Sequence, residues 1–187
     1  MQQETNTALL VMDMQEKMLS SFPSSAPLID NVGKAIAYAR EKSIPVIYIR
    51  VCFRPGAPEI NPNNKFFSAF TANYNLTEDF VRQWKEIHPS LAPKKEEIIV
   101  DKRRISAFSG SDLEVVLRAN NIQTLILTGI STSGVVLSTL REASDKDYSI
   151  TVLEDGCADR DADTHRFLME KIFPKQAEIM RVDEWIK

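Results

Sequence analysis

The sequence predicts an α/β fold in which a six-stranded parallel sheet carries helices on both faces. Six short apolar runs alternate along the chain with longer amphipathic segments. Most of the short runs are continuously apolar, as expected of strands that are covered on both faces. The 187 residues contain no internal repeat and no linker, so we expect a single domain over residues 1–187.

The expected strands are short and rich in β-branched residues. They cover residues 7–12, 45–51, 97–100, 124–128, 149–153 and 177–182. Strands that alternate with helices at this spacing are typical of parallel sheets, and helices on both faces make three layers. The sequence therefore predicts a three-layer, Rossmann-like arrangement.

Four amphipathic segments between the strands predict helices over residues 28–42, 111–121, 133–146 and 161–173. Pro45 follows the first of them, as is common after a helix end. In the second, Ser111 is the expected N-cap, with Glu114 three residues later in the capping-box position. Residues 53–96 differ, because they hold five of the nine prolines and many aromatic residues. We expect an excursion there, with one helix near residues 77–87.

Composition and charge argue against several classes of partner. The net charge of −3 gives no electrostatic case for nucleic acid or an anionic membrane surface. The first apolar run is too short to span a bilayer, and no basic segment precedes it, so we expect no signal peptide. Cys52 and Cys157 form no CxxC motif, which favours a reduced, cytoplasmic location. His88 and His165 lack neighbours at ligand spacing, so we expect no zinc and no cofactor.

Ligands of such sheets bind beyond the carboxyl ends of the strands. Asp13 follows the first expected strand, Arg54 the second, and Lys102 and Arg104 the third. The fourth leads into a Gly/Ser turn at residues 129–134, which could present backbone N–H groups to a ligand. We therefore expect Asp13 and Lys102 to end strands close to this turn, where a carboxylate beside a cation can act as general acid or base.

Each of these residues also has an ordinary structural interpretation. Asp13 could cap a helix, although no helical pattern begins promptly after it. Lys102 could be a solvated charge, although the run of three cations it begins favours anion binding. Cys157 and Cys52 could be small buried hydrophobes. The turn itself lacks the Lys-Ser/Thr pair of a phosphate loop and the second glycine of a nucleophile elbow, which argues against both kinds of site.

Four stretches together resemble the isochorismatase-like hydrolase superfamily, also called cysteine hydrolases. They are "ALLVMDMQ", "IPVIYIRVCFRPG", "VDKRRISAFSGSDLEVVLRANNIQTLILTGISTSGVVLSTLREA" and "VLEDGCADRDADTHRFL". The resemblance covers nearly the whole chain and implies an Asp-Lys-Cys triad in which Asp13 is the aspartate and Lys102 the lysine. The family's cysteine lies six residues after the glycine of the turn, and that position is Val135 here. The covalent mechanism of the family is therefore not supported by this sequence.

The resemblance further implies a non-proline cis peptide bond between Ile130 and Ser131. It also implies an oxyanion hole formed by the backbone N–H groups of Ser131 and Val135. True isochorismatases also lack the cysteine, and their aspartate acts as an acid on an enol ether, but they have glycine where this chain has Val135. Metal-dependent nicotinamidases use an Asp/His cluster after the second strand, and this chain has no histidine there, so no metal is expected. The resemblance also implies a homodimer or a higher homo-oligomer.

Our leading hypothesis is an enzyme that hydrolyses an amide, carbamoyl or enol-ether bond of a small polar or anionic molecule without a covalent intermediate. Asp13 is its expected general acid/base, and Lys102 holds the charge state of Asp13 and the substrate. Five further residues are expected to contact the substrate. Arg54 and Arg104 would bind a carboxylate of the substrate. Phe66, Phe67 and Phe108 would form walls of the pocket. A catalytically silent small-molecule-binding protein on the same fold is the alternative. A third hypothesis has Cys157 supply the missing thiol from the next strand.

Overall fold

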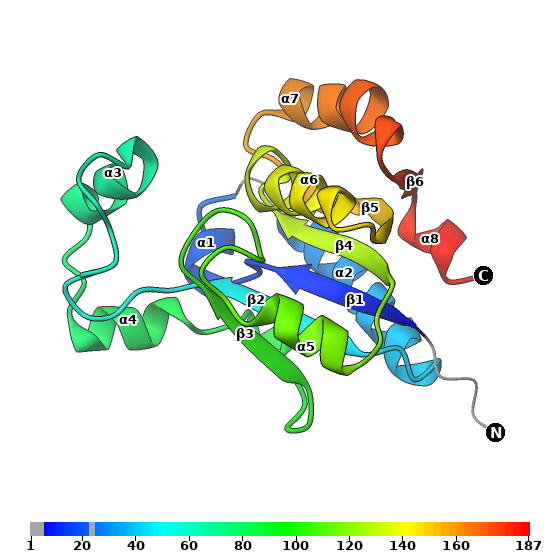
Figure 1. The fold of residues 1–187 in the computed structure, drawn as a ribbon, viewed down its shortest axis with the longest axis horizontal. Coiled ribbons are helices and arrows are strands. Elements are labelled where there is room, and N and C mark those ends of the chain that lie inside the picture. Colours follow the sequence, from blue (N-terminus) through cyan, green and yellow to red (C-terminus); the bar gives the residue numbers. More distant parts are fainter. Residues whose placement is uncertain (1–5, 23–24) are drawn as a thin grey trace.

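The computed structural model describes residues 6–22 and 25–187 and confirms the α/β fold (Figure 1). Residues 1–5 and 23–24 of the expected domain lie outside this description. Six parallel strands form one sheet in the order β3-β2-β1-β4-β5-β6. They are β1 (Thr7–Met12), β2 (Val46–Val51), β3 (Ile98–Lys102), β4 (Thr124–Ile130), β5 (Ser149–Ala158) and β6 (Glu178–Met180).

The strands differ from the expected ones mainly at their carboxyl ends. β3 includes Lys102, which the sequence placed after the strand. β5 runs on to Ala158, with an irregular register against β4 between Leu127 and Gly129. Cys157 therefore lies inside β5, opposite Gly129, rather than beyond the strand end.

Both faces of the sheet are buried, which explains the continuously apolar strands. In β1, Leu9 and Val11 pack on the face covered by α2 (Ser25–Glu41) and α8 (Val182–Trp185). Ala8, Leu10 and Met12 pack on the opposite face, under α5 (Leu113–Ala119), α6 (Leu137–Asp145) and the segment 168–173. Figure 1 shows α2 behind the sheet and α5 and α6 in front of it. Because successive residues of a strand point to opposite faces, a strand between two helical layers must be apolar throughout.

Helical structure occurs at each predicted position, with π-helical turns over Thr132–Val136 and Leu168–Ile172 forming parts of the third and fourth predicted helices. The helices over Glu16–Leu19 and Lys65–Asn73 have no counterpart in the prediction. Besides α2 and α8, the α-helices are α1 (Glu16–Leu19), α3 (Lys65–Asn73), α4 (Glu78–Trp84), α5 (Leu113–Ala119), α6 (Leu137–Asp145) and α7 (Ala162–Phe167). The expected N-cap at Ser111 is wrong, because Asp112 occupies that position of α5. Ser111 Oγ instead accepts a hydrogen bond from Leu113 N and donates one to Ala107 O.

The excursion between β2 and β3 contains two helices, α3 and α4, where the sequence predicts one. Asn64 caps α3 by accepting a hydrogen bond from Phe67 N, and Thr77 caps α4 by accepting one from Phe80 N. The excursion projects from the body of the molecule (Figure 1) and has its own apolar cluster, which includes Phe53. It therefore packs largely on itself and on the end of β2.

The chain order reverses between β1 and β4, which are neighbours at the centre of the sheet. Connections leave these two strands in opposite directions, and this leaves a crevice at their carboxyl ends. Gly129 makes the close pairing possible, because its φ is +128° and a Cβ added there would overlap the carbonyl oxygen of Met12. The site described below lies at this crevice.

Replacing Gly129 by alanine tests this constraint. We expect Gly129→Ala to lower the free energy of unfolding by about 3 kcal/mol or more, because the backbone of β4 must move away from β1. Gly33→Ala is the matched control, since Gly33 lies within α2 and its added Cβ would only touch Leu91 at 3.8 Å. It should stabilise the protein by about 0.5–1 kcal/mol. Urea unfolding measures the free energy of unfolding of both variants. Equal changes in the two would contradict a special requirement for glycine at position 129.

Candidate active site

Asp13 turns the chain away from the sheet at the end of β1. Its φ of 54° lies in the left-handed region, which aspartate adopts more readily than most residues. Its N–H donates to Ile49 O at 2.8 Å, which fixes this turn against β2. The side chain is buried, at 5% exposed, so the carboxylate needs a partner inside the protein.

Lys102 is that partner. Its Nζ lies 2.9 Å from Asp13 Oδ2, and its side chain is only 2% exposed. The same Nζ donates to the backbone carbonyls of Arg104 and Ile105, both at 3.0 Å, so each of the three N–H donors has an acceptor. The other oxygen of Asp13, Oδ1, is buried and has no hydrogen-bond partner within residues 6–22 and 25–187. That oxygen is the acceptor left over for a ligand.

Burial raises the pKa of Asp13 above its usual value of 3.8, while the ammonium of Lys102 acts in the opposite direction by favouring the carboxylate. Burial is the larger effect. Asp13 therefore binds a proton more readily than an exposed aspartate does, which suits a group that must take up and release a proton.

A small cavity of about 80 Å³ lies beside this pair. The turn after β4 forms one wall, where the peptide bond between Ile130 and Ser131 is cis, as the resemblance implied. Phe66 and Phe67 of α3 close another wall. The lining residues are Asp13, Met18, Val51, Phe66, Phe67, Lys102, Ile105, Ile130, Ser131, Gly134 and Val135. The structure thus brings together seven of the ten residues that the sequence suggested.

Three expected substrate contacts lie elsewhere. The exposed guanidinium of Arg54 pairs with Glu59 Oε1 at 2.8 Å. Arg104 donates to the backbone carbonyls of Arg103 and Glu59, at 2.7 and 2.9 Å. Phe108 is buried in the core beneath α5 and α6, with its ring 6.0 Å from that of Tyr148. Position after a strand does not fix the direction of a long side chain, and in each case nearer acceptors or apolar surface hold it away from the cavity.

Gln15 is a buried residue near the site that the sequence did not reveal. Its Oε1 accepts from Val51 N at 2.9 Å, and its Nε2 donates to the carbonyls of Val51 and Trp84. Trp84 Nε1 also donates to Val51 O, at 2.9 Å. These bonds tie the chain after β1 to the end of β2 and to α4, and so they position Val51 at the edge of the cavity. A glutamine after a strand carries no pattern that predicts this role.

The turn is also held from the side of β5. Thr132 Oγ1 lies 2.8 Å from His165 Nδ1, and Ser133 N donates to Asp159 Oδ2 at 2.6 Å. His165 is half-buried, and burial lowers the pKa of its imidazole. The neutral ring can exchange a hydrogen bond with Thr132 in either tautomer.

Neither cysteine lines the cavity. The thiol of Cys157 is buried within β5 near Leu127 O, and burial raises its pKa strongly. Burial also raises the pKa of Cys52, to about 11. A thiol with a raised pKa is a poor nucleophile at neutral pH. Val135 borders the cavity in the position that the resemblance assigns to the family's cysteine.

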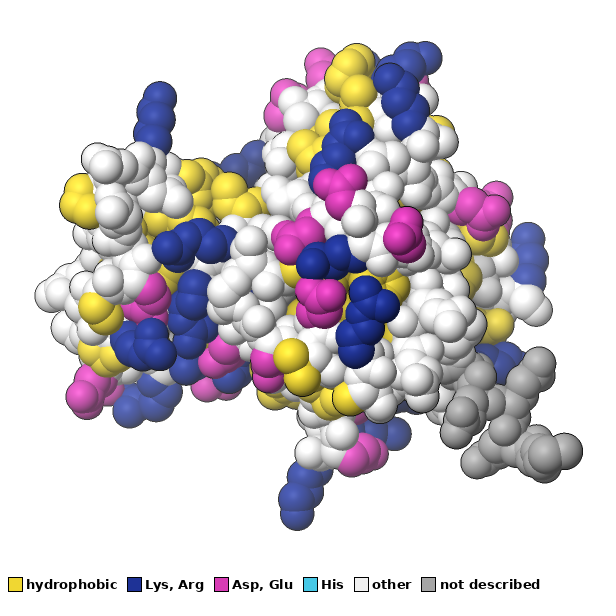
Figure 2. Space-filling view, viewed as in Figure 1, with side chains coloured by type: hydrophobic (Ala, Val, Ile, Leu, Met, Phe, Trp, Pro, Cys, Tyr) yellow, Lys and Arg dark blue, Asp and Glu magenta, His cyan; other side chains and the backbone are white. Residues whose placement is uncertain are grey.

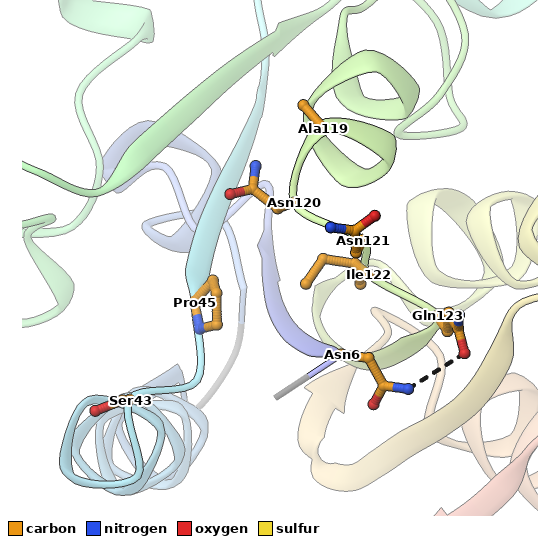
Figure 3. A pocket seen from close by; sticks show the side chains of 8 residues that line it. All are labelled: Asn6, Ser43, Pro45, Ala119, Asn120, Asn121, Ile122 and Gln123. Atoms are coloured by element: carbon orange, nitrogen blue, oxygen red, sulfur yellow. Dashed lines mark hydrogen bonds between the residues drawn. The ribbon is translucent and has the colours of Figure 1, made fainter. Parts of the chain in front are cut away.

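A hollow of about 450 Å³ lies at the opposite, amino end of the strands (Figure 3). Its lining contains Asn6 and Gln123, which share a hydrogen bond of 3.2 Å, and no charged side chain. Across the described chain, no three His, Cys, Asp or Glu side chains are grouped so that they could hold a metal ion. No helix in the same part of the chain is long and apolar enough to cross a membrane.

Removing the ammonium should destabilise the protein in a pH-dependent way. In Lys102→Met, Asp13 keeps its burial and loses its partner, so we expect a loss of about 3–5 kcal/mol in the free energy of unfolding at pH 7. The pKa of Asp13 in the folded variant is then above its unfolded value. The loss should therefore be small below the unfolded pKa and should grow as the pH rises towards the folded pKa.

The control is the double variant Asp13→Asn/Lys102→Met, which removes both charges. Its unfolding free energy, measured in urea between pH 4 and pH 8, should exceed that of Lys102→Met by a margin that widens with pH. A margin that stays constant across this range would show that the pair is not an ion pair in the folded protein.

Residues 7–184 match the model of the Isochorismatase domain. The chain is 32% identical to the uncharacterized isochorismatase family protein YecD of Escherichia coli O157:H7, over 95% of this chain and 93% of that protein. It is also 32% identical to the ureidoacrylate amidohydrolase RutB of Pseudomonas syringae pv. syringae, over 80% of this chain and 69% of that protein. The crystal structure of N-carbamoylsarcosine amidase from Thermoplasma acidophilum superposes with a TM-score of 0.78 at 25% identity, covering 95% of this chain and 96% of that one. This chain belongs to the isochorismatase family of hydrolases.

Proposed function

We propose that this protein hydrolyses an amide or carbamoyl bond of a small molecule without a covalent enzyme intermediate, using Asp13 and Lys102 as its acid–base pair. The observation that carries the proposal is the buried carboxylate of Asp13 in the lining of the cavity, with one oxygen held by Lys102 and the other without a hydrogen-bond partner among the described residues. A catalytic base needs such an arrangement, with one oxygen fixed and one available.

In the proposed reaction, water attacks the carbonyl carbon of the substrate while the carboxylate of Asp13 takes its proton. A C–O bond forms, and the carbonyl oxygen becomes an oxyanion. The backbone N–H groups of Ser131 and Val135, which border the cavity, donate hydrogen bonds to that oxygen. Asp13 then returns the proton to the leaving nitrogen as the C–N bond breaks, so the enzyme ends in its starting state.

Two observations support water rather than a side chain as the nucleophile. Val135 has no group that can attack a carbonyl, and both thiols lie outside the lining of the cavity. The amide bond type rests on relatives with amidase names, such as RutB and N-carbamoylsarcosine amidase. The enol ether that cysteine-free isochorismatases cleave is the other bond type to be tested.

Val135 also favours a second candidate, a binding protein that has lost catalysis. Such a protein would recognise a carbonyl compound through the same turn without turning it over. Burying an ion pair costs several kcal/mol of desolvation. A protein that only binds its ligand has no catalytic reason to keep such a pair. The intact pair therefore favours the enzyme.

Turnover of a panel of compounds tests the proposal. The panel contains simple amides, N-carbamoyl amino acids, ureidoacrylate and enol ethers. We expect wild type to hydrolyse at least one member, and Asp13→Asn to lose roughly 10²–10⁴-fold in kcat, because the base is gone. Asp163→Asn, an exposed aspartate on α7, and Cys157→Ala should retain wild-type kcat. Activity that survives Asp13→Asn, or that disappears in Cys157→Ala, would contradict the mechanism.

The pH dependence of kcat/KM for the same substrate gives an independent check. Because the carboxylate form of Asp13 is the active base, the rate should fall as the pH drops through its pKa in the free enzyme. Burial raises that pKa, so the acid limb should have its midpoint above 3.8. A midpoint at or below 3.8 would assign the limb to a different, exposed group.

A further inference from the structure

A second and larger cavity, of about 720 Å³, adjoins the catalytic one. Met18, Val51, Phe66 and Phe67 line both cavities. We call the larger one the aromatic pocket, because its further lining includes Phe53, Phe70, Tyr74 and Trp84. Figure 2 shows hydrophobic side chains gathered where the α3 region meets the body of the molecule.

The rings of the aromatic pocket are packed against one another. Phe70 lies 4.9 Å from both Tyr74 and Trp84, measured between ring centroids, and Phe53 lies 5.3 Å from Phe67. Mutual packing of this kind fixes ring orientation. Phe66 and Tyr74, which both line the pocket, remain 65% and 45% exposed. Exposed apolar side chains that line one hollow are typical of a binding site.

Three cations line the aromatic pocket, and no carboxylate does. Lys17 donates to the neutral Gln83 Oε1 at 2.8 Å, and Arg160 donates to Ser21 Oγ at 3.0 Å. No carboxylate in residues 6–22 and 25–187 lies within 4.0 Å of the charged nitrogens of Lys17, Lys65 or Arg160. Since the chain as a whole carries a net charge of −3, three such cations around one apolar hollow favour an anionic ligand.

The catalytic cavity, at about 80 Å³, is much smaller than the aromatic pocket, at about 720 Å³. The two cavities can therefore hold different parts of one substrate. A substrate larger than the catalytic cavity can extend past Phe66 and Phe67, which line both cavities, into the aromatic pocket.

We infer that the substrate has an aromatic body ending in a carboxylate, which binds in the aromatic pocket and is attracted by the cations that line it, Lys17, Lys65 and Arg160. The position of the scissile bond beside Asp13 rests on the proposed function, whereas binding of the aromatic carboxylate does not. The substrate class is therefore an amide or carbamoyl compound of an aromatic acid, rather than a short aliphatic one.

Fluorescence of Trp84, which lines the pocket, tests the inference directly. The chain has two tryptophans, and Trp185 lies on α8 against Tyr38, so Trp185→Phe leaves Trp84 as the reporter. The probes are 3-phenylpropanoate, its neutral analogue 3-phenylpropan-1-ol, and propanoate, which lacks the ring. We expect 3-phenylpropanoate to bind at least about tenfold more tightly than either of the others.

The role of the three cations is tested with the triple variant Lys17→Gln/Lys65→Gln/Arg160→Gln, made in the Trp185→Phe protein. It should lose about tenfold in affinity for 3-phenylpropanoate and keep its affinity for the alcohol, because only the charge contact is removed. Lys175→Gln, an exposed lysine near the amino end of β6, is the matched control and should bind as the parent does. Equal affinities for acid and alcohol in the parent, or an unchanged triple variant, would overturn the inference.

Two further results separate this inference from the proposed function. Retained probe binding by Asp13→Asn, together with no turnover by wild type, supports the pocket and rejects only the enzyme. Turnover of small amides without probe binding rejects only the inference. Sedimentation velocity shows whether the chain forms a dimer that Phe66→Asp converts to monomers. If it does, and no probe binds, the inference is overturned and the exposed rings belong to an interface with a second copy of the chain.

Discussion

The buried ion pair of Asp13 and Lys102 is the interaction on which the site depends. It joins the ends of β1 and β3, which are not neighbours, because β2 lies between them. Burying either charge without its partner would cost several kcal/mol, so the burial of each group depends on the other. The ammonium also holds the carbonyls of Arg104 and Ile105, and it thereby fixes the loop after β3. One contact thus sets both the charge of the base and the shape of the cavity around it.

The sheet order explains why this pair meets the turn after β4. β1 and β4 are central neighbours, and Gly129 allows their backbones to approach closely enough for the turn to lie beside Asp13. Contacts from Asp159 and His165 then hold the turn from the far side. In the proposed mechanism the turn contributes backbone N–H groups, and the absence of a cysteine side chain at Val135 does not remove them.

The excursion between β2 and β3 contributes what the sheet cannot. Its α3 places Phe66 and Phe67 over the cavity, and its α4 places Trp84 against the end of β2. Gln15 couples the two parts, since it bonds both to Val51 and to the carbonyl of Trp84. In the proposed function the chemistry therefore comes from strand ends, while the space for the rest of a substrate comes from a loop that packs mainly on its own aromatic residues.

The sequence by itself determined the strands, the two-sided burial of the sheet and the strand-end positions of Asp13 and Lys102. These features depend on local apolar patterning and on the rule that strand ends gather at one edge, and both can be counted along the chain. The resemblance added the cis bond before Ser131. Only the tertiary structure decided that Phe66 faces the cavity while Phe108 enters the core, and that Arg54 and Arg104 turn to the Glu59 region. It alone also revealed the buried role of Gln15. The physical reason is that the direction of a long side chain is chosen by partners distant in sequence, which no local pattern records.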